Sequence, residues 1–174
     1  MKLEEYFASA EFRMSRDELL REHAIAAAER IVREVRDVGL KLPGRSQLYS
    51  LYSIAQAGGI EGLVTLSSRQ AEKELKKEKE KNSDTPRTGF WGRLLDLLKT
   101  KLPDHAQSVL TGLGVIMAFD HVPKNEQGRL KSLNNKAKSD YLNAIVSVYF
   151  EHFTCHYHYF IQEAKHAGTS QDAA

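Results

Sequence analysis

The chain has little of what stabilises secreted domains and nothing that resembles a membrane span. It holds a single cysteine, Cys155, so no internal disulfide can form and a reducing cytoplasm is the expected compartment. No apolar run approaches the roughly 20 residues that a transmembrane helix needs. The first residues, MKLEEYFASAEF, are partly acidic and do not resemble a secretory signal. We therefore expect a soluble, cytoplasmic protein with no membrane partner.

Signatures of catalysis are also scarce. The glycines of Gly112-Leu-Gly114 lack the preceding strand and the Lys-Ser/Thr ending with which phosphate loops hold a nucleotide. Cys155 has no evident base and orienting group, which a catalytic thiol requires. We predict that the protein is not an enzyme and that it carries no cofactor.

The net charge is small, but the charges are unevenly distributed. The formal charge is +2, which is too mild by itself to indicate a nucleic-acid partner. Residues 1–22 hold six acidic and four basic side chains. Residues 85–103 hold four basic side chains against Asp96 alone, and residues 121–139 hold five against Glu126 alone. The middle and later parts of the chain are therefore the candidate anion-binding segments.

Helical periodicity marks the first part of the chain. Ser15-Arg-Asp-Glu18 has the pattern of a capping box and predicts that a helix begins there. Gly39 and Pro43 predict where this helix ends. Its apolar stripe recurs at spacings of three and four residues. The stripe consists of Leu19, Leu20, His23, Ala24, Ala27, Ile31, Val35 and Val38.

A glycine pair divides the next helical segment. An apolar stripe runs over residues 48–55, and a second stripe starts at Ile60, directly after Gly58-Gly59. This pattern predicts two helices that meet at close backbone contact. The second helix continues into the Glu- and Lys-rich residues 71–81, which we predict to be a solvated helical end.

Further helices are predicted over residues 90–98, 109–119 and 141–164. In the first of these, Trp91 lies among apolar residues, which favours packing over base stacking. The last has a wide apolar face that is rich in aromatic residues. No segment has a convincing strand pattern.

These patterns predict an all-α protein, a compact bundle of about five to seven helices with a long C-terminal helix. We expect a single helical domain over residues 15–167. An N-terminal amphipathic arm over residues 1–14 precedes it, and a polar tail over residues 168–174 follows it.

Four features occur in an order that is typical of one known family. They are an Ala-rich first helix at 24–28, a Gly-Gly-Ile-Glu-Gly-Leu joint at 58–63, Phe-Trp-Gly-Arg-Leu-Leu at 90–95, and Ser-Asp-Tyr-Leu-Asn-Ala at 139–144. This order resembles the small all-helical subunit of type III-B (RAMP-module) CRISPR effector complexes. In pattern, the resemblance extends over roughly residues 20–165.

The resemblance implies a noncatalytic subunit of a type III RNA-guided antiviral complex. Such a subunit stacks with copies of itself and with other effector subunits, and it holds the backbones of guide and target RNA. Lys and Arg bind phosphate without reading bases, so this contact is expected to be independent of sequence and sensitive to salt. The candidate RNA-binding residues are those in or beside basic segments: Arg45, Arg87, Arg93, Lys99, Lys101, Lys124, Arg129, Lys131, Lys136 and Lys138.

Two other functions remain open from the sequence. One is a helical adaptor that binds proteins without touching RNA. The other, which we rank lower, is a metal-binding helical protein that uses His152, Cys155 and His156, since imidazole and thiolate suit zinc. A metal site normally needs a further ligand, for which the sequence offers Glu163, His121, His105 and His23. The ordinary expectation is that His152 and His156 only border the apolar face, and we predict no metal site.

Overall fold

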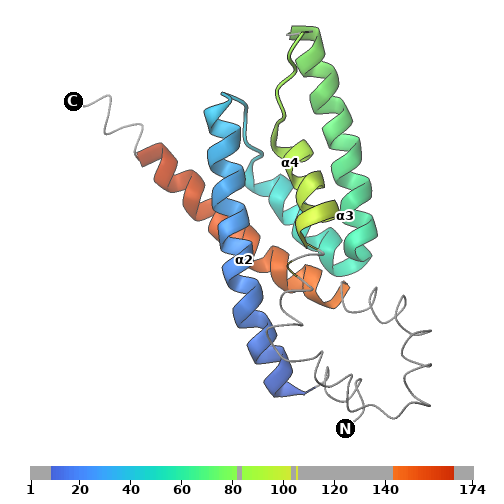
Figure 1. The fold of residues 1–174 in the computed structure, drawn as a ribbon, viewed down its shortest axis with the longest axis vertical. Coiled ribbons are helices and arrows are strands. Elements are labelled where there is room, and N and C mark those ends of the chain that lie inside the picture. The colour runs from blue at the N-terminus through green and yellow to red at the C-terminus, as the bar shows by residue number, and fades with distance from the viewer. Residues whose placement is uncertain (1–8, 82–83, 103–104, 106–142, 167–174) are drawn as a thin grey trace.

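The computed structural model describes residues 9–81, 84–102, 105 and 143–166. The regular elements in these ranges are α2 (Ala10–Asp37), α3 (Arg45–Lys81), α4 (Phe90–Asp96), the π-helical η1 (Leu97–Lys101) and a C-terminal helix over residues 143–166 (Figure 1). The predicted all-α fold is confirmed for this part of the chain, in which no strand occurs. The predicted number of helices also depends on segments outside these ranges, including 109–119.

Helix α2 begins earlier than the sequence pattern indicated. It starts at Ala10, and Ser15 lies inside it, so the predicted start at the capping box was wrong. Its predicted end was correct. Gly39 adopts a left-handed φ of 71°, and the Leu40 N–H donates to the Val35 carbonyl at 3.1 Å. This is the pattern of a glycine C-cap, which satisfies carbonyls left without partners at the helix end.

Helix α3 bends sharply at the predicted glycine joint. Gly59 has φ 59° and ψ −156°, a conformation that is essentially restricted to glycine, so α3 consists of two helices over residues 45–58 and 60–81. The Ile60 N–H at the start of the second helix donates to Oδ1 of Asn143 at 3.2 Å. Asn143 belongs to the C-terminal helix, so a side chain distant in sequence caps the restarted helix.

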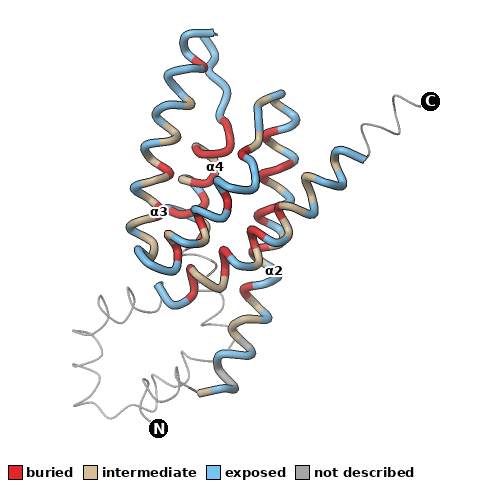
Figure 2. The backbone as a smooth tube through the Cα atoms, turned by 180° about the vertical axis from the view of Figure 1, so that it is seen from behind, coloured by how far each residue is buried: buried red, intermediate tan, exposed pale blue. Residues whose placement is uncertain are grey.

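The core lies where the C-terminal helix crosses α2, while α4 packs against α3 (Figures 1 and 2). The crossing buries aromatic rings of the C-terminal helix together with the aliphatic stripe of α2. Trp91 is 9% exposed, so the prediction that it packs in the core is confirmed. The fully buried aromatic residues of the C-terminal helix are Tyr149, Phe150, Phe153 and Tyr157.

Length and hydropathy also limit how these helices relate to a membrane. None of the helices in the described ranges is both long enough and apolar enough to cross a bilayer.

We predict that Gly59→Ala lowers the free energy of unfolding by about 1–3 kcal/mol, because alanine is strained at this φ and ψ. Its Cβ would also lie 2.8 Å from the carboxamide carbon of Asn143. Asn143→Ala should cost about 1 kcal/mol, since it removes the cap of Ile60. Urea denaturation measures both effects.

Gly58→Ala is the matched control for this prediction. Gly58 has no positive φ, and its added Cβ would make only an ordinary 4.0 Å contact with Ile54. It should be neutral or slightly stabilising, because alanine favours helix. Equal destabilisation by Gly58→Ala and Gly59→Ala would contradict the assignment of the bend to Gly59.

Candidate functional site

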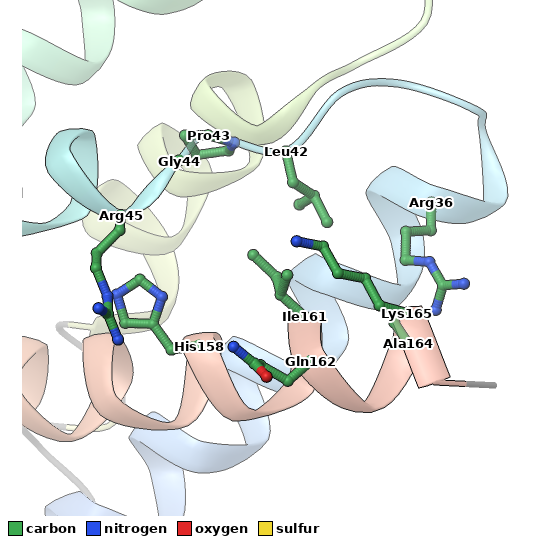
Figure 3. A pocket seen from close by; sticks show the side chains of 10 residues that line it. All are labelled: Arg36, Leu42, Pro43, Gly44, Arg45, His158, Ile161, Gln162, Ala164 and Lys165. Carbon is green, nitrogen blue, oxygen red and sulfur yellow. The ribbon is translucent and has the colours of Figure 1, made fainter. Parts of the chain in front are cut away.

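A pocket of about 490 Å³ lies between the end of α2, the start of α3 and the last turns of the C-terminal helix (Figure 3). Its floor combines apolar side chains with polar groups from the C-terminal helix. The lining residues are Arg36, Leu42, Pro43, Gly44, Arg45, His158, Ile161, Gln162, Ala164 and Lys165. Three segments that are distant in sequence therefore form one site.

The connection between α2 and α3 is fixed by a buried hydrogen bond. The phenolic hydroxyl of Tyr157 donates to the Pro43 carbonyl at 3.1 Å, and the Tyr157 side chain is fully buried. Burial raises the pKa of Tyr157, which keeps its hydroxyl protonated and able to donate. Pro43 is itself buried. This contact holds the pocket's upper edge on the C-terminal helix.

The charge of the pocket is entirely positive. Arg36, Arg45 and Lys165 line it, and none of its lining residues is an aspartate or a glutamate. Figure 3 shows Arg45 with His158 at one end and Arg36 with Lys165 at the other. Within the described ranges, neither Arg36 nor Arg45 forms an ion pair with a carboxylate. This basic pocket is therefore suited to an anion.

His158 adds to the pocket a polar atom that forms no hydrogen bond with the described residues. Its Nε2 atom is buried and has no hydrogen-bond partner in the described part of the protein. Burial, together with the positive charge of Arg45, lowers the pKa of His158. At neutral pH the ring is therefore neutral, with one nitrogen able to donate and the other to accept.

The structure places the predicted RNA-binding residues in different environments. Arg45 lines the basic pocket. Lys99 and Lys101 lie on η1, where Lys99 is exposed and Lys101 is half-buried. Arg87 and Arg93 both contact carboxylates. The other five candidates lie outside the described residues: Lys124, Arg129, Lys131, Lys136 and Lys138.

Arg87 connects three segments through an internal ion pair. Its Nε donates to Oε1 of Glu78 at 2.6 Å, and its Nη1 donates to the Val38 carbonyl at 2.8 Å. Glu78 is 5% exposed, so the expectation that residues 71–81 are a solvated helical end was wrong at this residue. The hydrogen bond from Arg87 lowers the pKa of Glu78 and keeps the carboxylate charged.

Two further acids hold α4 in place. Arg93 Nη1 contacts Oε2 of Glu34 on α2 at 2.6 Å. Glu74 on α3 accepts the N–H groups of Trp91 at 3.3 Å and Gly92 at 3.2 Å, and so caps the start of α4. Burial raises the pKa of Glu74, although these two N–H donors and Arg93 oppose the rise. Glu34 of α2 and Glu74 of α3 therefore both have structural partners on α4.

The metal hypothesis gains no support from the described residues, in which no three His, Cys, Asp or Glu side chains converge on a common point. Cys155 is exposed. The pKa of His156 is lowered by burial and by the nearby charges of Arg21 and His152. Of the further ligands that the sequence offered, His121 lies outside the described residues.

Of the residues that line the basic pocket, sequence reasoning identified only Arg45, and it missed the other three titratable side chains. Arg36 lies in the last turn of α2, while His158 and Lys165 lie near the end of the C-terminal helix. None of them belongs to a locally basic segment, which was the signal used to choose candidates. The available signal was that Arg36 is a cation in the last turn of its helix, where the helix dipole favours positive charge.

Comparisons with known proteins leave the family of this chain open. No protein-family model, no curated protein and no solved structure matches it.

We predict that Arg87→Met lowers the urea midpoint more than Arg69→Met does. Arg87→Met leaves the buried Glu78 carboxylate without its ion-pair partner. Arg69, by contrast, is an exposed residue of α3, the helix that also carries Glu78. Because the pKa of Glu78 is lowered, the stabilisation is present at neutral pH and is lost as the pH falls through that lowered pKa.

Denaturation between neutral and acidic pH checks both parts of this prediction. The Arg87→Met protein should lose part of the acid sensitivity that the parent shows, since Glu78 then returns toward its ordinary pKa. Equal midpoints for Arg87→Met and Arg69→Met would show that the ion pair contributes nothing to stability.

Proposed function

We propose that this protein is a noncatalytic, helical RNA-binding subunit that contacts the phosphate backbone through the basic pocket. The assembly that we propose for it is a type III CRISPR effector complex, in which it stacks with copies of itself and with other subunits beside guide and target RNA. The observation that carries the RNA part is the pocket's charge, with Arg36, Arg45 and Lys165 facing one volume that no acid lines.

Phosphate chemistry fits these side chains. Guanidinium groups donate paired hydrogen bonds to phosphate oxygens, and an ammonium group adds a further cation. Gly44 and Arg45 lie at the N-terminus of α3, whose first turn contains no acidic residue. The partial positive charge of that helix end adds to the attraction. Such contacts hold a backbone without reading its sequence.

The three arginines among the described candidate RNA-binding residues differ in whether they form an ion pair with a carboxylate. Arg87 and Arg93 are neutralised by Glu78 and Glu34. Their proposed contacts with RNA would have to compete with those ion pairs, whereas Arg45 has no described carboxylate partner. We therefore rank Arg45 first among the candidates. Lys99 and Lys101 remain candidates on a separate element.

The choice of assembly comes from the sequence pattern. The Gly58-Gly59 joint does divide two helices, as the resemblance implies, and the C-terminal helix carries the expected apolar stripe. A protein-binding adaptor is the second candidate, because Met14, Tyr49, Leu75 and Tyr159 expose large apolar side chains. These side chains lie on different segments, and apolar residues scattered singly are ordinary on protein surfaces.

We predict that Arg45→Glu weakens RNA binding several-fold and makes its salt dependence shallower. Loss of one phosphate contact to a single strand changes the slope of log K against log salt by about 0.7. Fluorescence anisotropy with a labelled single-stranded RNA of mixed sequence, at several salt concentrations, measures both quantities. Arg36→Glu should act in the same direction, since it changes the same pocket.

Arg69→Glu is the matched control, because it makes the same charge change at an exposed residue of α3 outside the pocket. It should weaken binding less than Arg45→Glu. Equal weakening by both variants would show that net charge, not the pocket, governs binding. The absence of salt-sensitive binding by the parent protein would contradict the RNA-binding function.

Affinity purification from the native host tests the proposed assembly. We predict recovery of CRISPR effector proteins and guide RNA, with the RNA contact weakened at high salt. Recovery of a different protein partner without RNA would support the adaptor instead. RNA cleavage by the purified chain alone would contradict the noncatalytic part of the proposal.

A further inference from the structure

An exposed tyrosine lies beside the basic pocket. Tyr49 is four residues after Arg45 on α3, so both side chains project from the same side of the helix. Tyr49 is 54% exposed, and its ring centroid lies 6.0 Å from that of His158, which lines the pocket. An exposed aromatic side chain therefore lies next to the Arg45 and His158 end of the pocket.

The setting of Tyr49 differs from that of Tyr159, the other strongly exposed tyrosine among the described residues. Tyr159 is 57% exposed, but its hydroxyl donates to Glu163 Oε1 at 3.2 Å. A carboxylate there repels a phosphate backbone. Tyr49 instead neighbours Arg45 and His158, and within the described ranges no hydrogen bond holds its hydroxyl. Charge thus favours Tyr49 for contact with a polyanion.

We propose that Tyr49 stacks on an unpaired base of a single-stranded RNA segment whose phosphates occupy the basic pocket. This inference rests on the proposed function and names its substrate class as single-stranded RNA. Basic grooves with adjoining aromatic side chains bind single strands in this way, because every base has a π face. The His158 ring, tilted 40° to Tyr49, forms the boundary between the stacking surface and the pocket.

The same geometry disfavours a duplex. The bases of an RNA helix are stacked on each other, so their faces are closed to a side chain, while unpaired bases can turn outward onto an aromatic ring. The pocket attracts phosphates of both forms. Only stacking on Tyr49 distinguishes a single strand from a duplex. The affinity should therefore be higher for a single strand than for a duplex of equal length.

The experiment compares the full chain with three variants: Tyr49→Ala, Tyr49→Phe and Tyr159→Ala. The probes are a labelled oligouridylate, an abasic oligonucleotide of equal length and an RNA duplex, all at one salt concentration. We expect Tyr49→Ala to lose roughly five-fold or more in affinity for oligouridylate. Tyr49→Phe should retain the affinity, and Tyr159→Ala should leave it unchanged.

The abasic probe separates stacking from charge, because it keeps the phosphates and lacks the bases. Tyr49→Ala should bind it as the parent does, whereas Arg45→Glu should weaken binding of every probe. Normal binding of oligouridylate by Tyr49→Ala overturns the stacking proposal, and so does an equal loss on the abasic probe. If these results accompany an intact effect of Arg45→Glu, the proposed function survives. If the parent binds no probe, both proposals fail.

Circular dichroism and urea denaturation of Tyr49→Ala complete the test. Tyr49 is exposed, so its truncation should leave the urea midpoint close to that of the parent. Loss of oligouridylate affinity with an unchanged midpoint supports stacking. Loss of affinity that is matched by unfolding, and that Tyr49→Phe also shows, overturns it.

Discussion

The bend at Gly59 is the constraint on which the rest of the arrangement depends. In a straight α3 the two halves would share one axis. The conformation of Gly59 changes the direction of the helix, so each half packs against different elements. The first half places Arg45 beside His158 of the C-terminal helix (Figure 3), and the second half runs beside α4 (Figure 1). Asn143 fixes the bend by capping Ile60, so the C-terminal helix that completes the pocket also holds the joint.

Two glutamates in the second half of α3 stabilise the fold through contacts with other segments. Glu74 caps α4, and Glu78 pairs with Arg87, which also donates to the carbonyl of Val38, the residue after the end of α2. Buried carboxylates are stable only with such partners, so the ends of α2, α3 and the 84–89 segment are tied together. The connection from α2 to α3 turns toward the C-terminal helix, where the Tyr157 hydroxyl donates to the Pro43 carbonyl.

Local patterns predicted the helices well because helix periodicity and glycine chemistry act over a few residues. The stripe before Gly39, the joint at Gly59 and the burial of Trp91 all follow from such signals. The start of α2 at Ala10 was missed, because a capping box also fits inside a helix. Of the pocket, only Arg45 was predicted. Tertiary packing brings Arg36 and Lys165 to the same pocket as Arg45. Neither residue lies in a locally basic segment, so the charge pattern of the sequence did not indicate them.

The proposed contact with RNA does not require a large net charge, and this chain has a formal charge of only +2. What a phosphate experiences is the field nearby, not the net charge, because salt screens charges beyond about 8–10 Å. Internal pairing with Glu34 and Glu78 removes Arg93 and Arg87 from that field. The basic pocket is lined by Arg36, Arg45 and Lys165 and by no aspartate or glutamate. Placement of acids, more than the number of bases, thus decides where an anion binds.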